Sequence, residues 1–502
     1  MERDFPTVAR TFPMALACIL AWGVLAASAS AAELPGLTAC LDEAMRSNPR
    51  IVAAQSEALA ALRDADAARL SFRAPTLSAS AGQVEEPIET PFGSMGFFVP
   101  QNALSAQLGV EAPLAAGVYG AAGARQMTHR TAGEADGDDL ATAGARLRIP
   151  LWRDRGFHEN RLEVDSLSAE SRAQAAAAHA SVLDELSGVA LAYAQLLFQA
   201  ADAMEVARAL ERAEALAKET ADRAELQDVA EYHLFPARYE VAVRREELAG
   251  SKGRITTALD DLSGAVGRFL PREALSDDLT AAGAVLDAWA QDAAVSEAAG
   301  MLSAAAVENI PEVFAARESA RSKRSAALSV HERDKPSLDV LLGMGWGSRP
   351  DEDVDRDVGY GAAVVFSTPL SRDGVQAKIE AAEARADAAR ADADAAEFSA
   401  RVRHAQAVSS FTNACSRLAM AEDSVTQARF ALEAENARFS IGDGSSRNVL
   451  DAQKDLTNAT RRKLAVAFEV VASFLELRRS SGLPPLASWP PDPVSSRPAG
   501  DS

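Results

Sequence analysis

Residues 337–346 read Ser-Leu-Asp-Val-Leu-Leu-Gly-Met-Gly-Trp, with a large apolar side chain at every second position. The same alternation recurs at 360–366, which read Tyr-Gly-Ala-Ala-Val-Val-Phe. Alternation with a period of two predicts β-strands that have one apolar face and one polar or small face. Strands of about ten residues with these two faces are typical of barrels in an outer membrane.

The first half of the chain shows the same alternation at 77–81 and 141–149. Between these segments, residues 104–110 are a candidate for a further strand, and the sequence leaves the structure of 84–139 otherwise open. Four clear strands per chain cannot enclose a pore, because a barrel of about eight strands only just encloses packed side chains. The sequence therefore predicts that several chains share one barrel.

Long helical segments follow the strands in each half. In the second half, apolar residues recur every seven positions, at Phe411, Leu418, Val425, Leu432 and Phe439. This heptad spacing predicts coiled-coil packing. On its own it would fit a periplasmic coiled coil as well as the wall of a duct, so the strands decide between them.

The lengths of the helical segments predict an architecture. The segments 156–223 and 374–438 would each span roughly 100 Å at about 1.5 Å per residue, while the return segments 231–267 and 446–482 are shorter. Two short helices placed end to end match one long helix, so each half is predicted to form a long antiparallel pair below a hairpin of strands.

The two halves repeat the same landmarks in the same order. Pro49 and Pro311 each precede a helical run and a strand, and one constant offset of 215 relates residues 223–267 to 438–482. Such self-similarity predicts two structural repeats. We assign the repeats to 33–268 and 300–482, with an inter-repeat linker at 269–299.

The two ends of the sequence have different character. Two arginines, an apolar run from Phe12 to Ala27 and small residues up to Ala32 predict a secretory signal peptide at 1–32. Six prolines after Gly482 predict a disordered tail at 483–502. The mature chain is thus expected to leave the cytoplasm without a helical membrane anchor.

Cys40 allows two interpretations. Leu37-Thr38-Ala39-Cys40 matches a lipoprotein signal in its letters, but Glu33 and Pro35 separate it from the apolar run. The alternative is a half-buried helical cysteine. A disulfide between Cys40 and Cys415 also stays open.

Composition excludes several classes of function. The net charge of −21 argues against nucleic-acid binding, because phosphate backbones attract basic surfaces. Three cysteines and six histidines show no zinc spacing, and nucleophile-elbow and phosphate-loop motifs are missing from the sequence. We therefore expect no enzyme, no metal and no cofactor.

Three segments carry a family resemblance. They are Leu-Asp-Glu-Ala-Met-Arg-Ser-Asn-Pro at 41–49, the Pro-Leu strand ends at 150–151 and 369–370, and above all residues 438–453. On these segments the chain resembles the TolC-like outer-membrane efflux proteins, also called outer membrane factors. The resemblance implies a mainly α fold in two repeats, with a homotrimeric 12-stranded outer-membrane barrel above a periplasmic α-barrel.

The same resemblance implies a function and partners. The expected role is a passive exit duct of a tripartite efflux or type I secretion system in the outer membrane of a Gram-negative cell, extending into the periplasm. Its partners would be a periplasmic adaptor, or membrane fusion protein, and an inner-membrane transporter of the RND or ABC type. The alternative is a periplasmic coiled-coil scaffold without a pore, and the exported substrate is not specified by the sequence.

The resemblance also suggests where the duct is narrowest. The family carries an acidic pair at its inner constriction, and Asn448 and Asp451 occupy the matching positions here. Arg447 lies four positions before Asp451, close enough on a helix to screen its charge. We expect Arg447, Asn448 and Asp451 to form the pore constriction.

The turn before these residues is the expected contact with the adaptor. Gly442, Asp443, Gly444 and Ser445 form a turn of small residues that would let a partner helix approach the backbone. In the first repeat, Gln227 replaces the turn glycine and Pro236 stands at the position of Asp451. That tip is expected to differ in shape.

Overall fold

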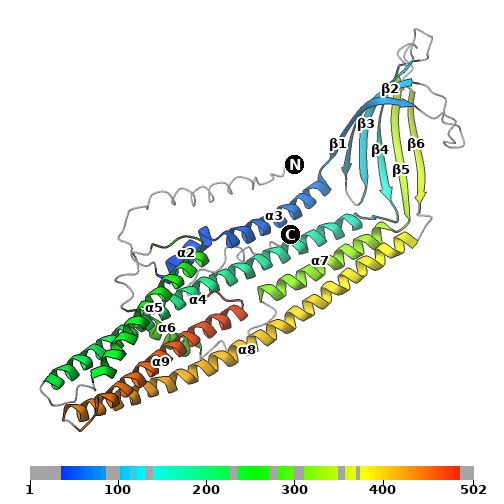
Figure 1. Ribbon diagram of the computed structural model, residues 1–502. Helices are drawn as coiled ribbons and strands as arrows, with labels where there is room; N and C mark the ends of the chain where they lie inside the picture. Colours follow the sequence, from blue (N-terminus) through cyan, green and yellow to red (C-terminus); the bar gives the residue numbers. More distant parts are fainter. Residues whose placement is uncertain are drawn as a thin grey trace, which may run out of the picture. The chain divides into compact units, whose positions relative to one another are not determined.

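The computed structural model describes residues 36–85, 102–114, 117–130, 139–225, 234–271, 281–297, 310–348, 357–368, 373–441 and 443–486 (Figure 1). The predicted signal peptide, residues 487–502 of the tail, Gln227 and Gly442 lie outside the described residues. The chain divides into two compact units. One contains Leu186–Gly300, Val408–Leu477 and the N-terminal part up to Pro49, and the other contains Arg50–Glu185, Met301–Ala407 and the part from Arg478 onward. Each unit therefore combines segments of both halves.

Helices make up most of the described chain. They are α2 (Leu37–Ser47), α3 (Pro49–Arg73), α4 (His158–Glu225), α5 (Leu234–Val266), α6 (Ala282–Glu297), α7 (Pro311–Arg333), α8 (Asp373–Ser440) and α9 (Ser446–Ser480). The long helices α4 and α8 have 68 residues each. Both their first and their last residues are separated by the predicted offset of 215.

The return helices α5 and α9 end in the same way. Gly267 and Gly482 follow them with φ angles of 82° and 70°. In each case the next residue donates a second hydrogen bond back into the last turn, Arg268 to the carbonyl of Ser263 and Leu483 to that of Arg478. This is a glycine C-cap, which satisfies carbonyls that the helix leaves unpaired.

Each of these caps packs at or next to the proline landmark of its own half. A Cβ at Gly267 would lie 2.8 Å from the backbone of Ser47 and Asn48, and a Cβ at Gly482 would lie 2.8 Å from the ring of Pro311. The Asn48 side-chain amide also donates to the carbonyl of Ala265 at 2.9 Å. Gly482 thus lies against Pro311 itself, and Gly267 against the two residues just before Pro49.

The first unit has a packed core with a charged centre. Leu186, Val189, Leu196 and Val206 of α4 are almost fully buried, as are Leu259 and Leu262 of α5. Among them, Asp202 is 5% exposed and accepts hydrogen bonds from Arg254 of α5 at 3.0 Å and from Arg461 of α9 at 2.6 Å. A buried carboxylate therefore joins three helices, and its hydrogen bond raises the pKa of the Arg461 guanidinium.

In the part of the chain that the structure describes, α4 has an apolar stretch that by composition could cross a membrane, and 44% of that stretch is buried inside the protein. The sequence did not predict such a stretch after the signal peptide. Many of the alanines and leucines of α4 are buried in the protein, as in a core helix.

The second unit carries one sheet of six antiparallel strands in the order β1-β2-β3-β4-β5-β6. The strands are β1 (Thr76–Glu85), β2 (Asn102–Pro113), β3 (Tyr119–Arg130), β4 (Asp139–Pro150), β5 (Ser337–Ser348) and β6 (Asp357–Ser367). The four clear strands of the sequence correspond to β1, β4, β5 and β6, and the candidate at 104–110 is β2. The sequence missed β3, which is rich in glycine and alanine and shows no large apolar alternation.

Cys40 lies within α2 and is 1% exposed, and burial raises the pKa of its thiol to about 11. Cys415 is half-buried in α8, and no disulfide joins the two residues. The structure thus favours the buried helical cysteine among the interpretations of Cys40.

Candidate pore wall and helix tip

Register joins the apolar residues of all six strands into rows on one face of the sheet. One row runs Leu77, Val110, Ala122, Ala145, Met344 and Tyr360, each paired with the next across neighbouring strands. Leu77 is 70% exposed and Tyr360 is 91% exposed. A face that is apolar and open across the whole sheet suits contact with lipid.

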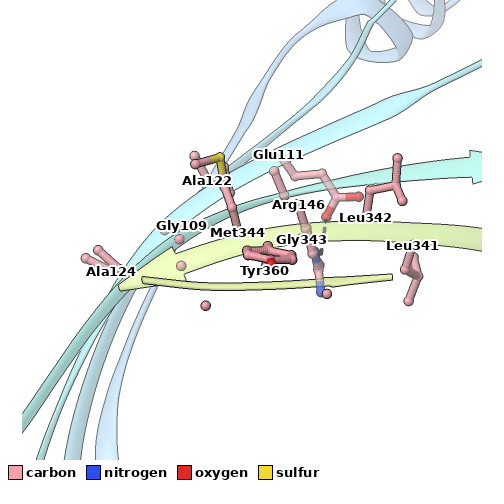
Figure 2. Close-up of a pocket in the computed structure, with 18 of the residues that line it drawn as sticks. Gly109, Glu111, Ala122, Ala124, Arg146, Leu341, Leu342, Gly343, Met344 and Tyr360 are labelled. Atoms are coloured by element: carbon pink, nitrogen blue, oxygen red, sulfur yellow. Dashed lines mark ion pairs between the residues drawn. The ribbon is translucent and has the colours of Figure 1, made fainter. Parts of the chain in front are cut away.

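The opposite face is small and polar. One of its rows runs Thr76, Glu111, Ala121, Arg146, Gly343 and Gly361. Arg146 of β4 and Glu111 of β2 pair at 3.8 Å across the intervening strand, over the small side chain of Ala121 (Figure 2). Exposed side chains of both charges suit a face that lines a water-filled passage.

The neighbouring row on the polar face is almost entirely glycine. It runs Ser78, Gly109, Gly123, Gly144, Gly345 and Gly359, one residue from each strand. A Cβ at Gly144 would lie 2.8 Å from the carbonyl of Met344, and one at Gly123 would lie 2.9 Å from that of Leu108. The neighbouring backbones are therefore too close for side chains at Gly123 and Gly144. A pocket of about 840 Å³ follows the row across all six strands.

The hairpin of β2 and β3 is anchored where β4 passes into α4. The Tyr119 hydroxyl at the start of β3 donates to Asp154 at 2.5 Å and accepts from Asn160 at 3.1 Å. Its ring packs edge-on against Phe157 at 5.3 Å, and the guanidinium of Arg148 lies 4.3 Å from its centre.

The backbone at this anchor is strained. Asp154 and Phe157 have φ angles of 60° and 61°, values that cost non-glycine residues free energy. Gly117, in the turn before β3, approaches so closely that a Cβ there would lie 2.5 Å from the nitrogen of Gly156. Strained residues persist only where the surrounding contacts hold them, so the hairpin is built into this junction.

The second helix tip is a compact turn between α8 and α9. The N–H of Asn448 donates to the Ser445 hydroxyl at 3.3 Å, and that hydroxyl donates to Oδ1 of Asn448 at 3.1 Å. Ser445 is therefore the N-cap of α9. A Cβ at Gly444 would lie 2.9 Å from the nitrogen of Phe439, so the turn itself requires this glycine.

The start of α9 has one buried and one exposed face. Val449 and Leu450 pack with Phe439, Leu432 and Leu216 in a hydrophobic cluster at the tip. Arg447, Asn448 and Asp451, the predicted constriction residues, are all exposed. Asp455 and Asn458 extend the same exposed face.

Arg447 makes no close contact with Asp451 inside the described chain. Both Arg447 and Asp451 are described, and no ion pair joins them. Asp443 of the predicted adaptor contact is exposed, and its N–H donates to the carbonyl of Arg438 at 3.0 Å. The side chains of Asp443 and Asp451 are thus open to a partner.

At the first tip the structure adds residues that the sequence analysis missed. Phe235 and Tyr239, one turn apart on α5, are 63% and 70% exposed. Pro236 lies in the first turn of α5, where a missing N–H is tolerated. The exposed aromatic pair could have been found from its four-residue spacing beside a predicted tip.

Among the described residues, no group of three or more His, Cys, Asp or Glu side chains is arranged to hold a metal ion. The polar groups at the sheet and at the tip are paired charges, caps and exposed carboxylates. Their arrangement suits the lining of a passage and the contact with a partner more than the chemistry of a reaction.

Solved structures share this fold. The outer membrane protein VceC from Vibrio cholerae aligns over 89% of this chain and 96% of its own, with 19% identity and a TM-score of 0.63. The MtrE outer membrane channel of Neisseria gonorrhoeae aligns over 89% of both chains, with 16% identity and a TM-score of 0.60. The CmeC outer membrane channel of Campylobacter jejuni gives 15% identity and a TM-score of 0.59, over 89% of this chain and 85% of its own. At these identities the likeness establishes the fold alone.

A family model described as outer membrane efflux protein matches residues 302–483. These residues are an outer membrane efflux protein domain. No curated protein sequence matches the chain. The family match and the shared fold confirm the resemblance seen in the sequence, and with it the mainly α class with a barrel-forming sheet.

Two further expectations follow from the efflux-protein domain. The family is one of outer-membrane transport proteins, which agrees with the expected location in the outer membrane with a part in the periplasm. The matched family is one of efflux proteins and not of enzymes.

Proposed function

We propose that this chain forms a homotrimeric duct through the outer membrane, through which solutes leave the cell passively. The observation that carries the proposal is the sheet, whose register separates one continuous apolar face from one polar face over all six strands. A periplasmic scaffold would have no use for rows of exposed residues such as Leu77, Met344 and Tyr360.

The duct would work in a tripartite efflux or type I secretion system. Its partners would be a periplasmic adaptor and an inner-membrane transporter of the RND or ABC type, which supplies the energy. We further propose that residues 1–32 are a signal peptide, that 33–268 and 300–482 are the two repeats around the linker 269–299, and that 483–502 are a tail. The efflux-protein domain at 302–483 supports this organisation.

Native mass spectrometry and ion conductance test the duct. We expect detergent-extracted protein to have the mass of three chains and to conduct ions in planar bilayers. A stable monomer, or a trimer that never conducts, would favour the scaffold instead.

The adaptor contact is proposed at the second tip, at Gly442, Asp443, Gly444 and Ser445. Gly444 is required by the turn and Ser445 caps α9. A loss of export in variants of these two residues could therefore come from misfolding of the tip as well as from loss of the adaptor contact. Asp443 is exposed, and its side chain takes part in neither the turn nor the N-cap. Asp443→Trp therefore tests the adaptor contact without disturbing the fold of the tip.

In cells, Asp443→Trp should abolish export at a normal trimer yield. The matched control is Asp423→Trp, at an exposed position of α8 well before the turn. Export by Asp443→Trp at the wild-type rate would remove the contact from this turn.

The constriction is proposed at Asp451, supported by Asn448 and Arg447. Three copies of an exposed carboxylate near a threefold axis would repel each other and attract cations. Asp451→Ala should weaken cation selectivity and divalent-cation block in planar bilayers. Asp455→Ala, one turn further along the same exposed face, is the control and should change both much less.

A further inference from the structure

The sheet ends in two edges that must find partners in a membrane. Within the described strands, β1 pairs with β2 alone and β6 with β5 alone. Hydrocarbon offers no hydrogen bonds, so spanning sheets leave no open edge. Six strands are too few to close into a barrel with room inside.

The two edges are complementary to each other. They are similar in length, with 10 residues in β1 and 11 in β6. Because six strands follow each other antiparallel, β6 runs opposite to β1, and two copies can join edge to edge with the antiparallel pairing of outer-membrane barrels.

Resting on the proposed trimeric duct, we propose that three copies of this chain close one barrel of 18 strands, with β6 of each copy paired to β1 of the next. The occupant of each edge is therefore a second copy. The apolar face can continue across such a seam, because Tyr360 stands on it at one edge of the sheet and Leu77 at the other.

The hairpin of β2 and β3 accounts for the difference from the 12 strands that the family resemblance implies. Both strands pair along their full length, from Asn102 with Arg130 to Pro113 with Tyr119. Their apolar residues, Leu108, Val110, Ala122 and Ala124, lie on the same face as those of β4 and β5. The hairpin is thus part of the wall rather than a loop folded over it.

The anchor at the turn of the hairpin supports the same conclusion. Tyr119 hydrogen-bonds to Asp154, and Gly117 lies against Gly156, so the turn between β2 and β3 lies at the level where β4 ends and α4 begins. A segment added outside the barrel would not need residues strained to positive φ to receive it.

A wider exit follows from the larger strand number. The diameter of a barrel grows roughly in proportion to its strands, so 18 strands would give about 1.5 times the diameter of 12. Barrels of about 16–18 strands leave an aqueous channel. The outer end of this duct would therefore pass bulky solutes that a 12-stranded exit excludes by size.

Single-particle electron microscopy of the full-length protein tests the strand number. We expect a trimer with 18 strands around the barrel. A trimer with 12 strands would overturn this inference and leave the duct intact, whereas a dimer of 12 strands or a monomer would overturn the trimer and the inference together.

A deletion measures the consequence for size. Removing residues 102–130 takes out β2 and β3 and leaves β1 and β4 able to pair antiparallel. The radius of the largest polymer that can enter the barrel from the extracellular side should then fall to about two-thirds of its wild-type value. The control is removal of residues 90–97, between β1 and β2, which should leave this limiting radius unchanged. The same limiting radius in the wild type and in the 102–130 deletion would contradict the wider barrel.

Discussion

The two repeats agree in their helices and differ in their strands. The helices α4 and α8 start and end at the same offset, and α5 and α9 end at glycines with the same offset. Ahead of α4, however, the first repeat carries four strands, while the second carries two ahead of α8. The ends of the long helices have thus been kept to the residue, while one repeat carries twice as many strands as the other.

Physical constraints explain this difference. A helix that packs along its whole length against a partner of equal length cannot gain residues without losing register with that partner. An antiparallel sheet can accept a whole hairpin, because two added strands return the chain to its original direction and face. The sheet is where the size of this protein can change.

The largest effect is expected at the glycine row, which both repeats share. Gly144→Val would place a branched side chain within 2.8 Å of the carbonyl of Met344, where β4 of the first repeat meets β5 of the second. Because this seam joins the two repeats, we expect loss of the assembled barrel, measured as heat-modifiable migration of outer-membrane extracts. Gly361→Val points to the same face with no atom within 4 Å of the new Cβ, and should assemble normally.

The next effect separates the two C-caps. Gly267→Ala should destabilise the first repeat by roughly 3 kcal/mol, because a positive φ costs about 1–2 kcal/mol for alanine and the Cβ meets backbone atoms of Ser47 and Asn48. Gly482→Ala should cost about half as much, since its Cβ meets a proline ring that can shift. Thermal unfolding of the purified proteins gives both values.

The control for the caps is Gly264→Ala, inside α5 with open space around its Cβ. It should stabilise the helix by up to about 1 kcal/mol. Equal losses for Gly267→Ala and Gly482→Ala would show that the two repeats use their caps alike.

A third test compares positions that the offset makes equivalent. Asp202 is buried between Arg254 and Arg461, while its counterpart Arg417 pairs with Glu469 at the surface. Asp202→Ala should cost about 3 kcal/mol, because it leaves two guanidiniums without their partner in a core. Arg417→Ala should cost less than about 1 kcal/mol. Chemical denaturation measures the free energy of unfolding of both variants. Similar losses of stability would contradict the expected difference between the two repeats at this position.

The smallest effect concerns the tips. Ser445 caps α9, and its counterpart in the first repeat is Ala230, which has no side-chain oxygen. Ser445→Ala should cost about 1 kcal/mol and be seen as faster amide exchange in the first turn of α9. Ser446→Ala, at the next position, is the control. Equal amide exchange rates in the two variants would show that Ser445 is not the N-cap.

Much of the fold was accessible from the sequence. The long helices, their return partners, four of the strands and the repeat offset were predicted, since each depends on periodicity over neighbouring residues or on glycine and proline at fixed positions. Residues 104–110 were recognised as a candidate strand. The predicted constriction residues do share one exposed face of α9, although their place on a pore axis remains a prediction.

Other features could not be predicted because they depend on residues far apart in the chain. The strand β3 has few large side chains, and only its pairing with β2 and β4 identifies it. The glycine row becomes visible only when strands from both repeats are set in register, and the anchor of Tyr119 on Asp154 joins a turn to a strained junction.

Local periodicity by itself determined that this protein consists of long paired helices and two-faced strands, because hydrophobic spacing and turn residues act within a few positions of the chain. Tertiary structure alone decided that the sheet has six strands, which residues line its polar face and which edges stay open. Those properties are set by hydrogen bonds between strands, and a strand's partner is not written in its own sequence.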